Sequence, residues 1–290
     1  MSVTLLMLAG GRGTRFGLLN TILPKSAMPV YDESTLARNV RQARAAGFKE
    51  IIVSTRASFL KPVSELLAAA NLSGPEAAVK VVANRYHRYG ALPALLHLLN
   101  NQGAPRVALS LSDIFFIENA YPSLYEHSQL DENYLAVADP FDSVELSKGG
   151  IVVCDAEQRI RSILETPIEG NAEGVRWSGL AVFNRHLESH LKEFIAAGKG
   201  AAPIGNFFEH YRAKGNELRT CRVSDFINVN TPDDMFLASM YRAIELQAAD
   251  DDLGRGLSEV ASSVRKRLLR GKNERPDASA DRVEFLNSNA

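Results

Sequence analysis

Residues 8–17 read LAGGRGTRFG, and residues 23–30 read LPKSAMPV. The apolar run Val3–Leu8 leads directly into the first stretch, and a short apolar run bounded by glycines is typical of a buried strand. The chain therefore begins with a strand that ends in a glycine-rich turn, followed by a Pro-Lys pair. A strand, a glycine-rich turn and a nearby lysine in this order are typical of phosphate-binding proteins.

The glycine-rich turn has the chemistry of an anion site. Its glycines can take backbone conformations that aim several N–H groups at one anion, and they place no Cβ in the way. Arginine adds planar, forked donors suited to phosphate oxygens, and lysine adds a point charge. The residues with these properties are Gly10, Gly11, Gly13, Arg12, Arg15 and Lys25. We interpret the turn as a cradle for a polyphosphate.

Two common glycine-rich phosphate loops do not match. The dinucleotide fingerprint requires G-x-G-x-x-G, and here Gly17 comes one position too late after Gly11 and Gly13. A P-loop requires glycine directly before Lys-Ser, but Pro24 precedes Lys25.

The pattern instead resembles that of the nucleotidyltransferases that join an NTP to a phosphorylated sugar or alcohol. Their motif is L-A-G-G-x-G-T-R-L followed by x-P-K-x-x-x-P-V, and Phe16 replaces the last leucine of the first part. The resemblance covers roughly residues 1–245. Its matching positions are Leu8, Ala9, Gly10, Gly11, Gly13, Thr14, Arg15, Pro24, Lys25, Pro29 and Val30.

Composition agrees with a soluble enzyme. The chain has 290 residues, 46% of them hydrophobic, and a net charge of −1, which favours no attraction to nucleic acid. No apolar stretch reaches the ~18 residues of a membrane span, and no signal peptide is expected. Cys154 and Cys221 lack the spacing of a metal site, so we expect reduced thiols and a cytoplasmic protein.

Alternating apolar periodicity predicts an α/β fold. Strands are expected at 50–54, 79–83 and 106–111, with helices at about 35–46, 60–70 and 91–101, a pattern typical of a mostly parallel sheet with helices on both faces. Ser34 or Thr35 is expected to cap the first helix. Shorter strands from residue 134 onward indicate a mixed second half. The family resemblance implies a GT-A-like, Rossmann-like sheet of this kind.

The segment 109–116, LSLSDIFF, puts Asp113 just beyond a predicted strand, at the end where open α/β sheets bind ligands. A carboxylate there suits Mg²⁺, although it could be only a helix cap. The segment 226–234, FINVNTPDD, resembles the family's second metal segment. Asn228 stands where the family has an acidic ligand, and Asn230 is the alternative. Thr231-Pro232 also makes a good helix start.

Further positions are assigned only through the resemblance. Asn84 and Gly90 correspond to the part of the family that contacts the base. Gly150, Glu165 and Ser178 correspond to the acceptor side. There Thr166 replaces a lysine that would hold the acceptor phosphate, and Ser178 replaces an asparagine. These departures point to an unusual acceptor, or to neutral variation at a strand edge.

The C-terminal part is expected to be separate from the catalytic domain, with residues 1–249 forming the nucleotidyltransferase domain and 250–290 an amphipathic helix and a disordered tail. An apolar stripe with basic residues at its end runs through 253–268. Binding to a membrane surface is one interpretation. Packing on the domain, or a homo-oligomer formed through this helix, is the one that we favour. His186 and His190 share a helix face without zinc-protease spacing.

The resemblance implies an Mg²⁺-dependent enzyme of sugar-nucleotide synthesis that transfers NMP from an NTP to a sugar 1-phosphate or similar acceptor and releases pyrophosphate. Arg15, Lys25 and Asp113 would be catalytic. One alternative is a CTP-dependent cytidylyltransferase for a phosphorylated alcohol, amine or phosphonate. Another is a non-catalytic nucleotide-binding regulatory protein. The base and the acceptor stay open at this point.

Overall fold

The computed structural model describes residues 3–11, 13–72, 79–141, 150–165, 173–247 and 251–273. Its strands are β1 (Val3–Leu8), β2 (Pro29–Val30), β3 (Glu33–Ser34), β4 (Glu50–Thr55), β5 (Val79–Ala83), β6 (Arg106–Leu111), β7 (Ile114–Phe116), β8 (Tyr134–Ala138), β9 (Ile151–Cys154), β10 (Ile160–Leu164), β11 (Val175–Asn184), β12 (Arg219–Arg222) and β13 (Phe226–Asn228). Its α-helices are α1 (Thr35–Ala45), α2 (Leu60–Ala69), α3 (Ala91–Asn100), α4 (Tyr121–Ser128), α6 (Leu187–Phe194), α7 (Ile204–Ala213), α8 (Pro232–Gln247) and α9 (Asp251–Asn273).

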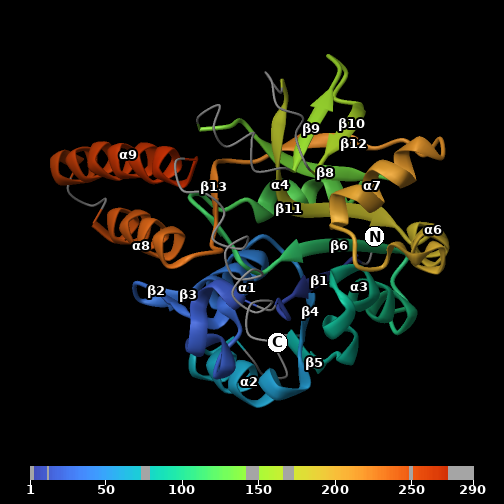
Figure 1. The fold of residues 1–290 in the computed structure, drawn as a ribbon, viewed down its shortest axis with the longest axis horizontal. Coiled ribbons are helices and arrows are strands. Elements are labelled where there is room, and N and C mark those ends of the chain that lie inside the picture. The colour runs from blue at the N-terminus through green and yellow to red at the C-terminus, as the bar shows by residue number, and fades with distance from the viewer. Residues whose placement is uncertain are drawn as a thin grey trace, which may run out of the picture.

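One central sheet organises the fold (Figure 1). Among the described residues it has nine strands, and its main order is β10-β9-β11-β6-β1-β4-β5. Strands β6, β1, β4 and β5 run parallel, β11 is antiparallel to β6, and β8 and β12 extend the sheet from β11. The predicted α/β architecture, with a mostly parallel mixed sheet, is confirmed.

Each face of the sheet is covered by its own helices, because side chains of a strand alternate between the two faces. Leu5 and Met7 of β1 belong to a core with α1, α2 and α4. Leu6 and Leu8 belong to a second core with α3, α6 and α7. The predicted strands lie within about two residues of β1, β4, β5, β6, β8, β9, β10 and β11, whereas the short strands β2, β3, β7, β12 and β13 were not predicted.

Local capping chemistry begins α1 and α8 where the sequence predicted. The Ser34 hydroxyl accepts a hydrogen bond from the Ala37 amide at 3.1 Å, which makes Ser34 the cap of α1. At α8, the Thr231 hydroxyl accepts from the Asp234 amide at 3.2 Å, while the Asp234 carboxylate accepts from the Thr231 amide at 2.9 Å. This reciprocal pair is a capping box, with Pro232 as the first helical residue.

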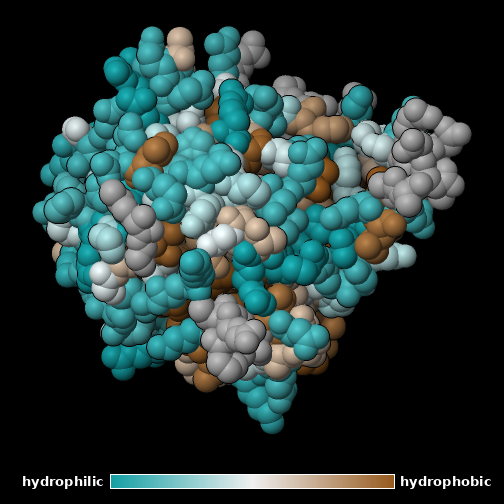
Figure 2. Space-filling model, turned by 180° about the vertical axis from the view of Figure 1, so that it is seen from behind, coloured by the Kyte–Doolittle hydropathy of each residue, from teal (hydrophilic) through white to brown (hydrophobic). Residues whose placement is uncertain are grey.

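The C-terminal helices α8 and α9 lie next to each other beside the β2–β3 hairpin and β13 (Figure 1). Their apolar residues Leu237, Val264 and Leu268 pack into a third cluster with Phe16 and Val229. The face opposite to that of Figure 1 is largely hydrophilic, with hydrophobic residues showing in separate places (Figure 2). No helix in the described ranges combines the length and hydropathy that crossing a membrane requires.

Candidate active site

A cleft of about 870 Å³ opens at the carboxyl ends of β1 and β6. From the sequence-predicted site, it is lined by Leu8, Ala9, Gly10, Gly11, Lys25, Gly90, Asp113, Gly150, Glu165 and Asn228. These residues come from segments that are far apart in the chain. The strand order reverses between β1 and β6, because β4 and β5 lie on the other side of β1, and ligands of open α/β sheets bind outside such a switch point.

Position 10 requires glycine because a side chain would not fit there, and position 13 favours glycine because its φ is positive. A Cβ at Gly10 would overlap the imidazole ring of His87, and the Gly10 carbonyl accepts a hydrogen bond from Arg56 Nε at 2.9 Å. Gly13 has a φ of +54° and begins the 3-10 helix Thr14–Thr21. Of the three glycines, only Gly13 has positive φ, so the expectation based on positive φ applies there and not at Gly10 or Gly11.

The predicted cradle is only partly inside the cleft. Gly10 and Gly11 line it, but Gly13, Thr14 and Arg15 do not. Thr14 and Arg15 are exposed on the short helix that follows the turn. Arg12 lies outside the described residues. The first two glycines of the turn therefore lie at the cleft, while Arg15 is not among the residues that line it.

Lys25 joins the two halves of the predicted catalytic centre. Its ammonium group pairs with the Asp113 carboxylate and donates a hydrogen bond to Asn230 Oδ1 at 2.5 Å. Both charged side chains are largely buried, with exposed fractions of 15% and 18%. Pro24 places Lys25 there, because its extended backbone leads into a single 3-10 turn, Lys25–Ala27.

The two predicted metal segments meet through a small sheet. Strand β7 follows Asp113, strand β13 ends at Asn228, and the two strands pair so that Asn228 is opposite Ile114. The Val229 amide then donates to the Asp113 carbonyl at 2.9 Å. Asp113, Asn228 and Asn230 offer oxygen atoms, which Mg²⁺ prefers. In the described part of the chain no three His, Cys, Asp or Glu side chains gather as a metal site, so amides would have to contribute.

Asn228 and Asn230 differ in their surroundings. The Asn228 side chain is exposed in the cleft lining. Asn230 is half-buried, and its side-chain oxygen is bonded to Lys25. Asn230 is therefore tied to Asp113 through the lysine, whereas Asn228 is open to a ligand in the cleft.

Two predicted site residues support the walls of the cleft without lining it. Asn84 is fully buried, and its amide nitrogen donates to Ser54 Oγ at 3.1 Å and to the Ala94 carbonyl at 3.0 Å. Ser178 is also fully buried and donates to the Ala136 carbonyl at 2.8 Å. Because their polar atoms are bonded within the protein, these two side chains hold neighbouring segments together. Gly90, with φ +125°, and Gly179, with φ +77°, line the cleft nearby.

Glu165 and Gly150, which the resemblance assigned to the acceptor side, line the cleft together with Trp177. Burial raises the pKa of the Glu165 carboxyl, and the hydrogen bond that it accepts from the Gly205 amide at 2.7 Å opposes this shift. Gly205 lies at the start of α7, where backbone N–H groups favour an anion. The Trp177 ring is oriented by its Nε1–H, which donates to the Leu180 carbonyl at 2.9 Å. Thr166 lies outside the described residues.

His87 is a cleft residue that sequence reasoning missed. Its ring covers Gly10, and Nε2 lies 3.0 Å from Ser54 Oγ and 3.1 Å from the Ser54 carbonyl. Burial is the main cause that lowers the pKa of His87 to about 4, so the imidazole is neutral at pH 7. Nothing in the spacing of YHRYG indicates that this histidine faces the glycine turn, because the contact is made only by the folded chain.

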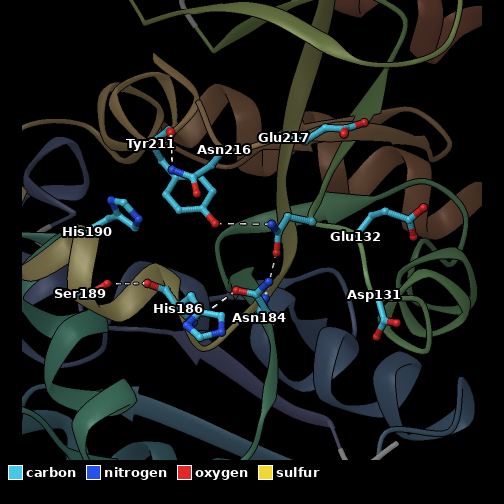
Figure 3. Close-up of a pocket in the computed structure, with 10 residues that line it drawn as sticks. Asp131, Glu132, Asn184, His186, Ser189, His190, Tyr211, Asn216 and Glu217 are labelled. Atoms are coloured by element: carbon cyan, nitrogen blue, oxygen red, sulfur yellow. Dashed lines mark hydrogen bonds between the residues drawn. The ribbon is translucent and has the colours of Figure 1, made fainter. Parts of the chain in front are cut away.

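A second cavity of about 500 Å³ lies away from the cleft, next to α6 and α7 (Figure 3). Its lining includes His190 of α6 and His186, which is the N-cap residue just before that helix and not within it as the sequence suggested. Figure 3 shows Asp131 and Glu132 standing apart from both histidines. This arrangement brings no group of carboxylates and imidazoles together as metal ligands among the described residues.

Comparison with known proteins agrees with this geometry. A family model described as "MobA-like NTP transferase domain" matches residues 5–202. Among solved structures, a protein described as a glucose-1-phosphate thymidylyltransferase from Bacillus anthracis is 20% identical, with a TM-score of 0.68 over 82% of this chain and 94% of that one. A UDP-glucose pyrophosphorylase complexed with UDP-glucose is 17% identical, with a TM-score of 0.72 over 82% and 97%.

A third similar structure has a different acceptor in its name. A CTP:phosphocholine cytidylyltransferase from Streptococcus pneumoniae is 15% identical, with a TM-score of 0.65 over 86% of this chain and 100% of that one. At these levels of identity the solved structures establish the shared fold.

Proposed function

Because the chain belongs to the family of MobA-like NTP transferases, we propose that it transfers NMP from an NTP to a phosphorylated small-molecule acceptor, a sugar 1-phosphate or a similar phosphate. An acceptor phosphate oxygen attacks the α-phosphorus, a new P–O bond forms, the bond to the bridging oxygen of the β-phosphate breaks, and pyrophosphate leaves. The observation that carries this proposal is the meeting of Gly11, Lys25 and Asp113 in one cleft.

Lys25 is the residue that we assign to the reacting phosphates. In the free protein its charge is balanced by Asp113 and its hydrogen bond goes to Asn230. An NTP in the cleft supplies phosphate oxygens that compete for the same ammonium group. Lys25 can then bind the α-phosphate and the incoming acceptor phosphate, where negative charge gathers in the transition state. Positioning and electrostatics supply most of the rate in such reactions.

Gly10 and Gly11 bring backbone N–H groups close to the polyphosphate. The neutral ring of His87 packs against Gly10 and limits its movement. Arg15 is exposed next to this turn, so we propose that it contacts the outer phosphates only when the NTP is bound. This assignment explains why an arginine of the motif stays outside the cleft lining of the free protein.

We assign Mg²⁺ to Asp113 together with Asn228 or Asn230. The donor set supports this assignment, because a carboxylate and amide oxygens are the hard ligands that Mg²⁺ would accept beside phosphate oxygens and water. Bound Mg²⁺ would neutralise charge on the phosphates. With only one carboxylate named, the protein alone should hold the ion weakly, and the nucleotide should contribute much of the affinity.

A second acceptor class is favoured by Glu165 and Trp177. Both side chains line the cleft, and a carboxylate and an indole ring each attract a cationic group, one as an ion pair and the other through its aromatic face. A phosphorylated amine with CTP is therefore our second candidate. One of the similar structures is named as a phosphocholine enzyme. That activity belongs to the other protein, and here it only suggests phosphocholine as one compound to test.

The test is a matrix of the four common NTPs against sugar 1-phosphates and phosphorylated amines, with pyrophosphate release as the readout. We expect one NTP–acceptor pair to release pyrophosphate in proportion to the enzyme and to require Mg²⁺. Absence of release in every combination, with nucleotide binding intact, would support the non-catalytic alternative instead.

A further inference from the structure

Helix α9 contacts the segment just before β13 through a buried arginine, Arg265. Arg265 is 1% exposed, although it lies on a helix whose neighbouring residues Lys266 and Arg267 are exposed. Its guanidinium group forms two hydrogen bonds with the Asp225 carboxylate, one of them at 3.0 Å from Nη2 to Oδ1. It also donates to the Phe226 carbonyl at 3.3 Å and lies 4.3 Å from the centre of the Phe141 ring.

Asp225 is the residue just before β13, and it forms hydrogen bonds and ion pairs with residues of several elements. Its carbonyl accepts from the Ile117 amide at 3.0 Å, just beyond β7. Its carboxylate accepts from the Phe226 amide at 2.7 Å and lies 3.5 Å from Arg176 of β11. Arg265 therefore binds the point where β13 is attached to β7 and close to β11.

Strand β13 ends at Asn228, one of the side chains that we assign to the metal, and Asn230 follows two residues later. It runs from Phe226 to Asn228, and the next backbone amide, that of Val229, is bonded to Asp113. The three residues of β13 connect Asp225 directly to Asn228. A shift at Asp225 is therefore expected to move Asn228 and Asn230 relative to Asp113.

We infer that Arg265 is a positioning residue for the metal segment, and that α9 is part of the working catalytic unit rather than an appendage. Apolar contacts support the same coupling, since Val264 and Leu268 pack into the cluster that holds Phe16 and Val229. A bidentate guanidinium–carboxylate pair fixes orientation as well as distance, which an apolar contact does not. This inference rests on the proposed function.

The test compares Arg265→Met with Arg267→Met, an exposed arginine of the same helix. Binding of Mn²⁺ is measured by electron paramagnetic resonance with each NTP present and with none, and the folded state is checked by circular dichroism and melting temperature. Loss of a group that orients a metal ligand typically weakens metal binding about tenfold or more. We expect a loss of this size in Arg265→Met, and no change in Arg267→Met.

A purely structural role predicts a different result. Arg265→Met would then have a lower melting temperature, but its folded fraction would bind Mn²⁺ with the wild-type affinity, and this outcome overturns the inference. If Arg265→Met does not fold, Asp225→Asn and Arg265→Lys take its place, because both keep hydrogen-bonding groups at the pair. Wild-type Mn²⁺ affinity in folded forms of both would overturn it equally.

Two further readouts separate this inference from the proposed function. If the wild type binds Mn²⁺ and NTP but releases no pyrophosphate with any acceptor, the proposed function fails while the Mn²⁺ comparison still decides the role of Arg265. If the wild type is active, Arg265→Met should raise the Mg²⁺ concentration at half-maximal rate and lower kcat, with KM for NTP at saturating Mg²⁺ changed only a few-fold.

Discussion

The ammonium group of Lys25 lies against the carboxylate of Asp113, and the same ammonium group is bonded to Asn230. Three segments that the sequence separates widely thus share one charge-balanced contact in the free protein. A lysine and an aspartate held in this way are each available to a ligand of the opposite sign. Phosphate can bind the lysine and a cation can bind the aspartate, which is the arrangement that the proposed reaction uses.

Lys25→Ala should lower turnover on the best acceptor by about 10²-fold or more, since one electrostatic contact in the transition state typically contributes that much. Its control is Lys61→Ala, because Lys61 is 85% exposed on α2. Steady-state pyrophosphate release measures both. Near-normal turnover in Lys25→Ala would remove Lys25 from the reaction.

Asp113→Asn should nearly abolish Mg²⁺-dependent activity, because it removes the one carboxylate that we assign to the metal. Conversely, Asn228→Asp should lower the Mg²⁺ concentration at half-maximal rate, since a charged oxygen binds a hard cation more tightly than an amide. A titration with Mg²⁺ at fixed NTP measures this. If Asn230→Asp has the effect and Asn228→Asp does not, the ligand is Asn230.

Glu165→Gln should separate the two acceptor classes. If the acceptor carries a cation, loss of the carboxylate charge should raise KM for the acceptor about tenfold or more, in line with the strength of hydrogen bonds to charged groups. If the acceptor substrate is a sugar without a cationic group, the amide oxygen of Gln can accept the same hydrogen bond as the carboxylate. KM for that substrate should then change little. KM for NTP should stay unchanged in either case, and the exposed Glu217→Gln serves as control.

Gly10→Ala should destabilise the protein by about 1–3 kcal/mol and weaken NTP binding, because the added methyl group overlaps the His87 ring in a packed site. Gly103→Ala is the matched control, since a Cβ there has no neighbour within 4 Å. Denaturant unfolding measures the difference. Adding His87→Ala should restore part of the lost stability, because the two residues are in contact; strictly additive losses would speak against the clash.

His87 should make stability fall in acid. Its pKa is lowered to about 4, mainly by burial, from an ordinary value of 6.5, so between these values the unfolded chain binds the proton and the folded chain does not. The stabilisation is fully present above about pH 6.5 and is lost as the pH falls through about 4, on the order of 3 kcal/mol in all. His87→Gln should flatten this part of the curve, whereas His186→Gln should not. An unchanged acid slope in His87→Gln would contradict the assignment.

Much of this protein can be read from short-range sequence pattern. Apolar runs such as Val3–Leu8 predict the buried strands because both faces of those strands are covered. Ser34 and Thr231-Pro232 predict helix starts because capping is a local interaction. The glycine turn with Lys25 indicates a phosphate site, since local backbone freedom and charge suffice for that inference.

Other features depend on which distant segments meet. Long-range packing decides three of these features. Asn84 and Ser178 support the cleft walls, the His87 ring packs against Gly10, and Arg265 binds Asp225. A side chain's type does not reveal whether its polar atoms face a ligand or a buried carbonyl. The sequence by itself determined the longer apolar strands and the starts of α1 and α8, because neighbouring residues decide them, and it supplied the phosphate-binding hypothesis. Only the tertiary structure decided which side chains share the cleft, because burial and opposing partners exist only in the folded chain.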